Sequence, residues 1–158
     1  MIRVKRYLLP GAIYYVTSVT DGRQNLFTDA RACRFFITCL EYHKQIFAFK
    51  IFGFVIMPDH FHCVIQPALG TTISKIIQHI KGNFARKYNF MRKEGGYIWQ
   101  QSFYDRVIQS EVQLSNEINY MHYNPVRTGL VDSPGDYEFS SYRYYFGEDY
   151  RNLVDRIA

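Results

Sequence analysis

The sequence has no long hydrophobic run and few cysteines. Its longest apolar run, residues 51–57, is far shorter than the roughly 20 residues that span a bilayer as a helix, so we expect no membrane protein. The three cysteines are odd in number and lack C-x-x-C spacing, which argues against a disulfide framework and a cysteine zinc site. Pro10-Gly11 interrupts the apolar stretch behind the basic N-terminus, so we expect no signal peptide and a cytoplasmic location.

What the sequence does contain is excess positive charge and many aromatic rings. Its 158 residues carry 19 Lys and Arg against 14 Asp and Glu, together with 14 Tyr and 13 Phe. This length suits a single domain over residues 1–158 with a core of its own. A basic chain favours a polyanionic partner, and rings beyond those that fill the core can stack on bases. Charge and rings together favour nucleic acid as the partner.

The expected elements follow the order βαββαβ and then α. Strands are predicted at residues 12–20, 49–57, 61–66 and 103–109, which are rich in β-branched and aromatic residues. Helical spacing of apolar residues predicts helices from a cap at residues 28–29 to about 46, from a cap at 71 or 72 to the glycines at 95–96, and from a capping box at 110–113 to Pro125. This order predicts an α+β, ferredoxin-like fold: a four-stranded antiparallel sheet with two helices on one face and an additional C-terminal helix.

Two histidines open the third expected strand. Side chains alternate across a strand, so His60 and His62 project from one face while Phe61 projects from the other, with Cys63. Two imidazoles at this spacing can chelate one metal ion, although H-x-H also occurs by chance among ordinary histidines. For Cys63, packing in the core is favoured over the alternative of a nucleophile served by a histidine.

The last expected helix carries a polar stripe. Gln113, Glu117, Tyr120 and Asn124 recur at helical spacing, beside the apolar stripe of the same helix. If this helix lies across the open face of the sheet, the polar stripe can face the histidines. The alternative is a solvated helix face on which Tyr120 is a half-buried packing residue.

A basic segment precedes the fourth expected strand. Residues 71–93 contain no acidic residue, and Lys75, Lys81, Arg86 and Lys87 are its candidate contacts to a phosphate backbone. A solvated helix face is the alternative. The tyrosines of residues 137–145 can stack on bases, but packing of the tail on the core is the favoured interpretation.

Four segments together resemble a known family, the single-tyrosine HUH transposases of the insertion-sequence type and in particular the REP-associated tyrosine transposases. The segments are YVTS at 15–18 with Arg23, VIMPDHFH at 55–62, WQQSFYDR at 99–106, and YMHYNPVRTGLV at 120–131. They occur in the order of the family and cover most of the chain. Their joint occurrence is much more specific than any one of them.

The resemblance implies a metal-dependent enzyme that cuts and rejoins single-stranded DNA. It implies a divalent ion, Mg²⁺ or Mn²⁺, at His60 and His62, with Asn124 as a candidate third ligand. It also implies Tyr120 as the nucleophile of a 5′-phosphotyrosine intermediate, and Arg127 is a further expected DNA contact. The implied substrate has hairpin or repeat-derived structure, and a homodimer is possible because relatives occur as monomers and as dimers.

Two other functions are compatible with the same residues. A DNA-binding module of this fold that no longer reacts would need only the charge and the rings, although the intact histidines and Tyr120 argue against it. A metal-dependent hydrolase that uses water would need a carboxylate ligand, and Asp59 is the one beside the H-x-H segment. A covalent adduct between protein and DNA distinguishes all three.

Overall fold

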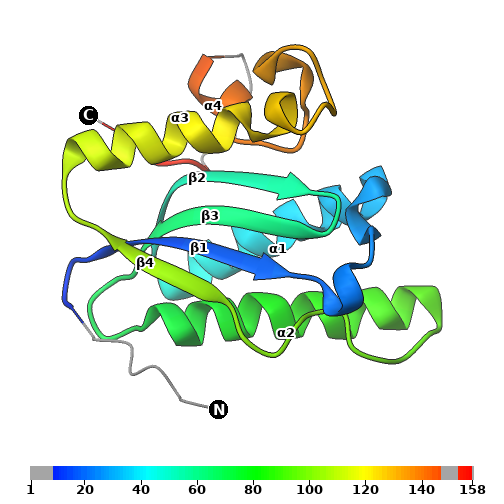
Figure 1. The fold of residues 1–158 in the computed structure, drawn as a ribbon. Coiled ribbons are helices and arrows are strands. Elements are labelled where there is room, and N and C mark those ends of the chain that lie inside the picture. The colour runs from blue at the N-terminus through cyan, green and yellow to red at the C-terminus, as the bar shows by residue number, and fades with distance from the viewer. Residues whose placement is uncertain (1–8, 147–152, 158) are drawn as a thin grey trace.

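The computed structural model describes residues 9–146 and 153–157. Its strands are β1 (Ile13–Val19), β2 (Lys50–Met57), β3 (His60–Gln66) and β4 (Tyr104–Ile108), and its helices are α1 (Ala30–Phe47), α2 (Ile73–Arg92), α3 (Glu111–Arg127) and the short α4 (Tyr142–Phe146). Short 3-10 turns lie at Asp21–Arg23, Leu26–Thr28 and Pro134–Asp136. The strands form one antiparallel sheet in the order β2-β3-β1-β4, which confirms the expected α+β fold (Figure 1). Each expected element is present, with ends that differ by a residue or two.

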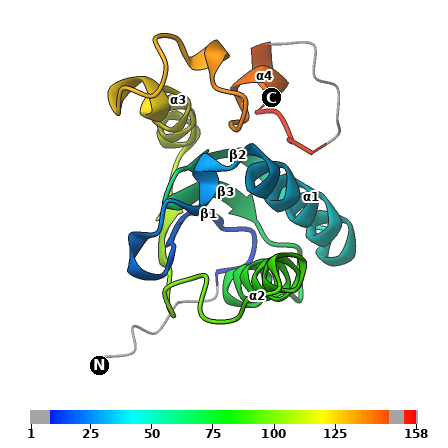
Figure 2. The same cartoon turned by 90° about the vertical axis from the view of Figure 1, so that its right-hand side faces the viewer.

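Helices α1 and α2 cover one face of the sheet and enclose the larger core (Figure 2). Phe61 and Cys63 of β3 enter this core with less than 2% of their surface exposed. The ring of Phe36 in α1 lies 4.7 Å from that of Phe61 and 5.4 Å from that of Phe84 in α2, measured between centroids. Each fully buried side chain of this size contributes roughly 1.5–3 kcal/mol to folding.

Helix α3 packs on the opposite face, over β2. Leu114, Ile118 and Met121 form its apolar stripe and contact the second core cluster, to which the sheet contributes Val55 and Val64. The sheet therefore lies between two unequal layers, with two long helices on one side and α3 on the other (Figure 2).

A glycine permits the close approach of α3 to β2. A Cβ atom at Gly53 would lie 2.6 Å from Cδ1 of Ile118 and 3.2 Å from Oγ of Ser141. The pairing of β2 with β3 also shifts register between Ile51 and Gly53. Gly53 therefore leaves room for the helix at the point where the strand is irregular.

Side chains cap the long helices as the sequence predicts. Asp29 accepts a hydrogen bond from the backbone N–H of Arg31, and Thr72 accepts one from that of Lys75. Ser110 accepts from the N–H of Gln113 at 3.1 Å, but the Gln113 side chain accepts from the N–H of Gln109. The capping box is thus half formed. In the standard pattern the Gln113 side chain would accept from the N–H of Ser110 itself, one residue later than observed.

The expected end of the last helix at Pro125 is wrong, because α3 continues to Arg127. A proline inside a helix removes one backbone N–H donor. The turn beyond Pro125 is nevertheless closed, because Thr128 donates to the carbonyl of Asn124 through its N–H and its hydroxyl at 3.1 and 3.0 Å. The carbonyl of Pro125 itself accepts from the N–H of Leu130 at 2.9 Å.

The C-terminal tyrosines pack on the fold, as expected. The Tyr137 hydroxyl donates to the carbonyl of Ile56, and the Tyr145 hydroxyl donates to that of Phe52, both at 2.5 Å. Tyr144 is 6% exposed within the larger core. Within residues 9–146 and 153–157, no helix has the length and apolarity needed to cross a membrane.

We expect Gly53→Ala to lower the free energy of unfolding by about 1–3 kcal/mol, because the new methyl group overlaps Ile118. The matched control is Gly82→Ala in the interior of α2, where a Cβ meets nothing within 4 Å. That change should stabilise the protein by roughly 0.5–1 kcal/mol, since alanine favours the helix. Urea denaturation measures both, and equal effects at the two positions would contradict the close packing of α3.

Candidate active site

The two histidines lie on the α3 side of the sheet, as their alternation predicts. Phe61, between them, enters the opposite core. The rings of His60 and His62 have centroids 4.8 Å apart and planes inclined by 77°. Cys63 is fully buried, and burial raises the pKa of its thiol, which argues against its role as a nucleophile.

Each imidazole has a hydrogen-bond partner on its Nδ1 atom. Nδ1 of His60 lies 2.6 Å from Oδ1 of Asp59, and Nδ1 of His62 lies 2.8 Å from the hydroxyl of Thr17. Metal-binding histidines commonly donate one ring N–H to such a partner, which fixes the tautomer and leaves the other nitrogen as the ligand. The arrangement therefore leaves Nε2 of both rings as the nitrogen that can bind a metal.

The backbone holds the β2–β3 turn, and with it His60, in place. The carbonyl of Asp59 accepts from the N–H of Thr20 at 2.9 Å, and the carbonyl of Pro58 accepts from the N–H of Phe27 at 2.9 Å. The Asp59 carboxylate also accepts from Arg23 at 3.3 Å. Partial burial acts to raise the pKa of Asp59, but the hydrogen bonds from His60 and Arg23 outweigh it and lower that pKa. Asp59 is therefore a carboxylate that orients His60.

His62 is held neutral. Burial is the main cause that lowers its pKa to about 3, and the positive charges of His60, Arg106 and Arg127 act in the same direction. A neutral imidazole is the form that binds a metal. The ring of Tyr15 lies 5.4 Å from that of His62. Burial raises the pKa of Tyr15 well above its usual range, so its phenol stays protonated.

The donor set fits a divalent ion that keeps open coordination positions. Among the residues described, no group of three His, Cys, Asp or Glu side chains is placed to hold a metal. Two imidazoles alone leave positions for oxygen ligands, which Mn²⁺ and Mg²⁺ both accept. Asn124 lies half-buried on α3, four residues after Tyr120, and its amide stays a candidate third ligand.

The polar stripe of α3 is tied to the sheet beside the histidines. Both carboxylate oxygens of Glu117 accept from Nη2 of Arg106 in β4 at 2.7 Å. The same guanidinium lies over the ring of Tyr15, 4.5 Å from its centroid. A chain of contacts thus runs from Glu117 through Arg106 and Tyr15 to His62. The sequence does not predict the Thr17 contact, which depends on strand register, or the Arg106 contact, which depends on how α3 packs on the sheet. From the sequence Asp59 is a candidate metal ligand only, although it directly precedes His60 and orients its ring.

Tyr120 lies on α3 and is 56% exposed, so its phenol is accessible from solvent. The guanidinium carbon of Arg127 lies 3.6 Å from the centroid of its ring. Helix α3 therefore presents an exposed phenol with an arginine over its ring, on the side of the sheet where β3 carries two oriented imidazoles.

Three of the four basic residues proposed on α2 are at the surface. Lys75, Arg86 and Lys87 are exposed, whereas Lys81 is only 8% exposed. The ammonium of Lys81 donates to the carbonyls of Gln100 and Ser102, at 2.9 and 3.2 Å. The expected surface position of Lys81 is thus corrected: it fastens the segment before β4 to α2, because a buried ammonium requires such acceptors.

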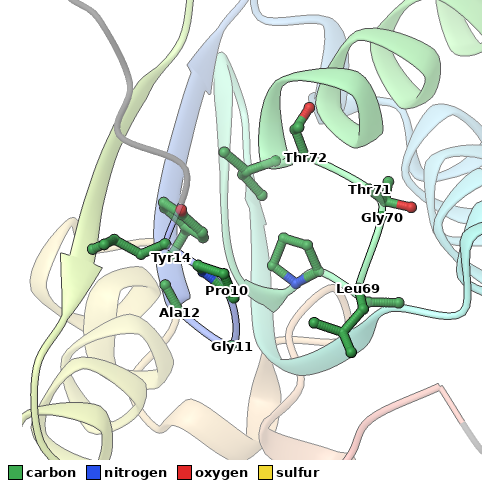
Figure 3. A pocket seen from close by; sticks show the side chains of 12 residues that line it. Pro10, Gly11, Ala12, Tyr14, Leu69, Gly70, Thr71 and Thr72 are labelled. Carbon is green, nitrogen blue, oxygen red and sulfur yellow. The ribbon is translucent and has the colours of Figure 1, made fainter.

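A separate pocket of about 300 Å³ lies at the other end of β1 and β3 (Figure 3). Its lining comes from residues 9–12, from Tyr14 and from residues 67–73. None of the candidate site residues lines it. The site is instead a surface formed by β3 and α3.

The chain combines a four-stranded antiparallel sheet, a histidine pair on β3 and a tyrosine-bearing helix, α3. Comparisons with known proteins identify the family that has these features. The sequence model described as "Transposase IS200 like" matches residues 10–124, and the chain belongs to this family of transposases. A Haemophilus influenzae protein assigned to the REP-associated tyrosine transposases is 28% identical over 154 residues, covering 90% of this chain and 86% of that protein. An Escherichia coli K12 REP-associated tyrosine transposase is 25% identical, covering 90% of this chain and 83% of that protein.

Solved structures share the fold. A REP-associated tyrosine transposase bound to a REP hairpin superposes with a TM-score of 0.79 at 22% identity, covering 100% of this chain and 93% of that one. A Deinococcus radiodurans R1 protein described as a transposase superposes with a TM-score of 0.52 at 17% identity, covering 77% of this chain and 98% of that one.

Proposed function

We propose that this chain is a strand transferase that cuts single-stranded DNA through a covalent bond to Tyr120, with Mg²⁺ or Mn²⁺ held by His60 and His62. The observation that carries the proposal is the histidine pair itself. Both Nδ1 atoms have partners, so both Nε2 atoms are available on the face where α3 presents an exposed tyrosine. Membership of a transposase family supports the same activity.

The proposed step is an in-line displacement at phosphorus. The Tyr120 oxygen forms a bond to the scissile phosphorus and gives up its proton to solvent, while the bond to the 3′ oxygen breaks and that oxygen takes up a proton. His60 and His62 would hold the divalent ion, which would offset the negative charge that develops on the phosphate oxygens. Attack by a 3′-hydroxyl reverses the step and joins strands, so the energy of the phosphodiester bond is retained.

The surface of α2 supports a DNA partner. It carries Lys75, Arg86 and Lys87 at exposed positions, with no acidic residue between Thr71 and Lys93. Phe90 is 85% exposed and, with Arg86 and Lys87, borders a shallow hollow of about 380 Å³. Bases stack on such rings while cations contact phosphates. The solved relative bound to a REP hairpin supports a hairpin-containing strand as the substrate.

The two alternatives differ from this proposal in specific ways. An inactive DNA-binding module would bind the same strand without forming an adduct. A hydrolase that uses Asp59 as a metal ligand is disfavoured, because both carboxylate oxygens of Asp59 already have partners in His60 and Arg23.

We predict that Tyr120→Phe abolishes the covalent adduct while folding and DNA binding persist, because only one exposed oxygen is removed. The measurement is a denaturing gel of protein incubated with labelled hairpin-containing single strands and Mn²⁺, with peptide mapping of the adduct. Tyr123→Phe is the matched control, since Tyr123 lies on the same helix and is 49% exposed. A normal adduct yield from Tyr120→Phe, or a nucleotide mapped to Tyr123, would overturn the assignment of the nucleophile.

We predict that His60→Ala and His62→Ala each weaken Mn²⁺ binding at least about tenfold, and that Asp59→Asn weakens it by roughly 10–100-fold. The reason for the last effect is that Asp59 orients His60. Titration of the DNA-free protein, followed by Mn²⁺ electron paramagnetic resonance, measures the affinity. His79→Ala on α2 provides a control at an exposed histidine. Unchanged Mn²⁺ affinity in both His60→Ala and His62→Ala would contradict the proposed metal site.

We predict that neutralising Lys75, Arg86 and Lys87 together makes the slope of log K against log salt concentration shallower by about 2. The reason is that each phosphate contact on a single strand contributes about 0.7 to this slope. Fluorescence anisotropy of a labelled strand over a range of salt concentrations gives the slope. Lys50→Gln, at the exposed start of β2, is the single-charge control and should match the wild type. If the triple variant keeps the wild-type slope, the DNA path does not follow α2.

A further inference from the structure

Tyr120 is exposed, yet its side chain is held by a contact within its own helix. The guanidinium of Arg127 stacks on the phenol ring with its carbon 3.6 Å from the centroid. Nη2 of the same group donates to the backbone carbonyl of Tyr120 at 2.5 Å. The guanidinium is therefore fixed at one end by a hydrogen bond while its carbon lies over the ring.

This contact restricts a side chain that would otherwise move. A tyrosine with 56% of its surface exposed has few neighbours to select one rotamer. A stacked guanidinium is attracted by the ring electrons and also provides a flat contact surface. Lysine carries the same charge, but its ammonium is compact and lacks the planar arrangement of N–H donors of a guanidinium. It therefore cannot cover the ring and donate to the carbonyl at the same time.

The contact requires the last turn of α3. Arg127 is seven residues after Tyr120, two helical turns along the same face, and long side chains on a helix lean toward its N-terminus. A helix that ended at Pro125 would not present Arg127 on this face. The continuation of α3 past Pro125 thus gives Tyr120 its partner.

We propose that Arg127 is a positioning residue that holds the phenol of Tyr120 in one orientation, on the side of the sheet that carries the histidine pair. This proposal rests on the proposed function and refines it, because Arg127 then acts through Tyr120 rather than as a DNA phosphate contact. Its loss should reduce the rate of adduct formation at saturating DNA, whereas the affinity for DNA should stay unchanged.

The first test needs neither DNA nor metal. Fluorotyrosine is incorporated at position 120 of the full chain, and its ¹⁹F resonance is compared between the wild type and Arg127→Lys. We expect the resonance of the variant to move toward that of free fluorotyrosine, because the stacked guanidinium is gone. Fluorotyrosine at position 123 is the control probe on the same helix and should not shift. An unchanged resonance at position 120 would overturn the proposal.

The second test measures single-turnover adduct formation with a hairpin-containing strand and Mn²⁺. Arg127→Lys should lower the maximal rate by roughly 10–100-fold, the cost of a misplaced reacting group, with Kd within about twofold of wild type. An unchanged rate, or a raised Kd with an unchanged maximal rate, would overturn the positioning role, and the latter would identify Arg127 as a DNA contact. Absence of an adduct in the wild type would instead refute the proposed function, and the ¹⁹F comparison would still decide whether Arg127 orders Tyr120.

Discussion

The site depends on the register in which β3 pairs with β1. In this register His62 lies opposite Thr17, and His60 lies opposite Val19. A slip of one residue would turn every side chain of β3 to the other face, moving the histidines into the larger core and Phe61 into solvent. Burial of Phe61, Cys63 and their neighbours therefore does more than stabilise the sheet. It determines which face the imidazoles occupy and gives His62 its hydroxyl partner.

Helix α3 is fixed by different interactions on its two sides. Its apolar stripe packs on β2, where Gly53 leaves space for Ile118. Its polar stripe is held by the pair between Glu117 and Arg106, in which the Glu117 side chain is 15% exposed and that of Arg106 is 57% exposed. Exposed ion pairs contribute little stability, so packing supplies most of the attachment and the ion pair mainly sets the orientation. The tyrosine is thereby placed relative to the histidines by the packing of α3 on β2 and by an ion pair whose arginine contacts Tyr15 beside His62.

Sequence analysis predicts the elements, the two-sided pattern of β3 and the polar stripe of α3, because each follows from the periodicity of neighbouring residues. It misses the partners of His62 and Glu117, since Thr17 meets His62 only through strand pairing and Arg106 meets Glu117 only when α3 packs on the sheet. It also places Lys81 at the surface, because a lysine on an acid-free helix gives no sign that two backbone carbonyls accept its ammonium. Local patterns predict local structure, whereas the residues around a site come from distant segments.

The two halves of the candidate site differ in burial, and the difference suits the reaction proposed above. His62 is partly buried and neutral, which suits the proposed ligand, whereas Tyr120 is more than half exposed. In the proposed reaction a DNA strand has to reach the phenol of Tyr120, and an exposed position lets the strand pass. Core packing is then unavailable to orient the phenol, and a surface residue has to do so. The stacked guanidinium of Arg127 meets that requirement without covering the site.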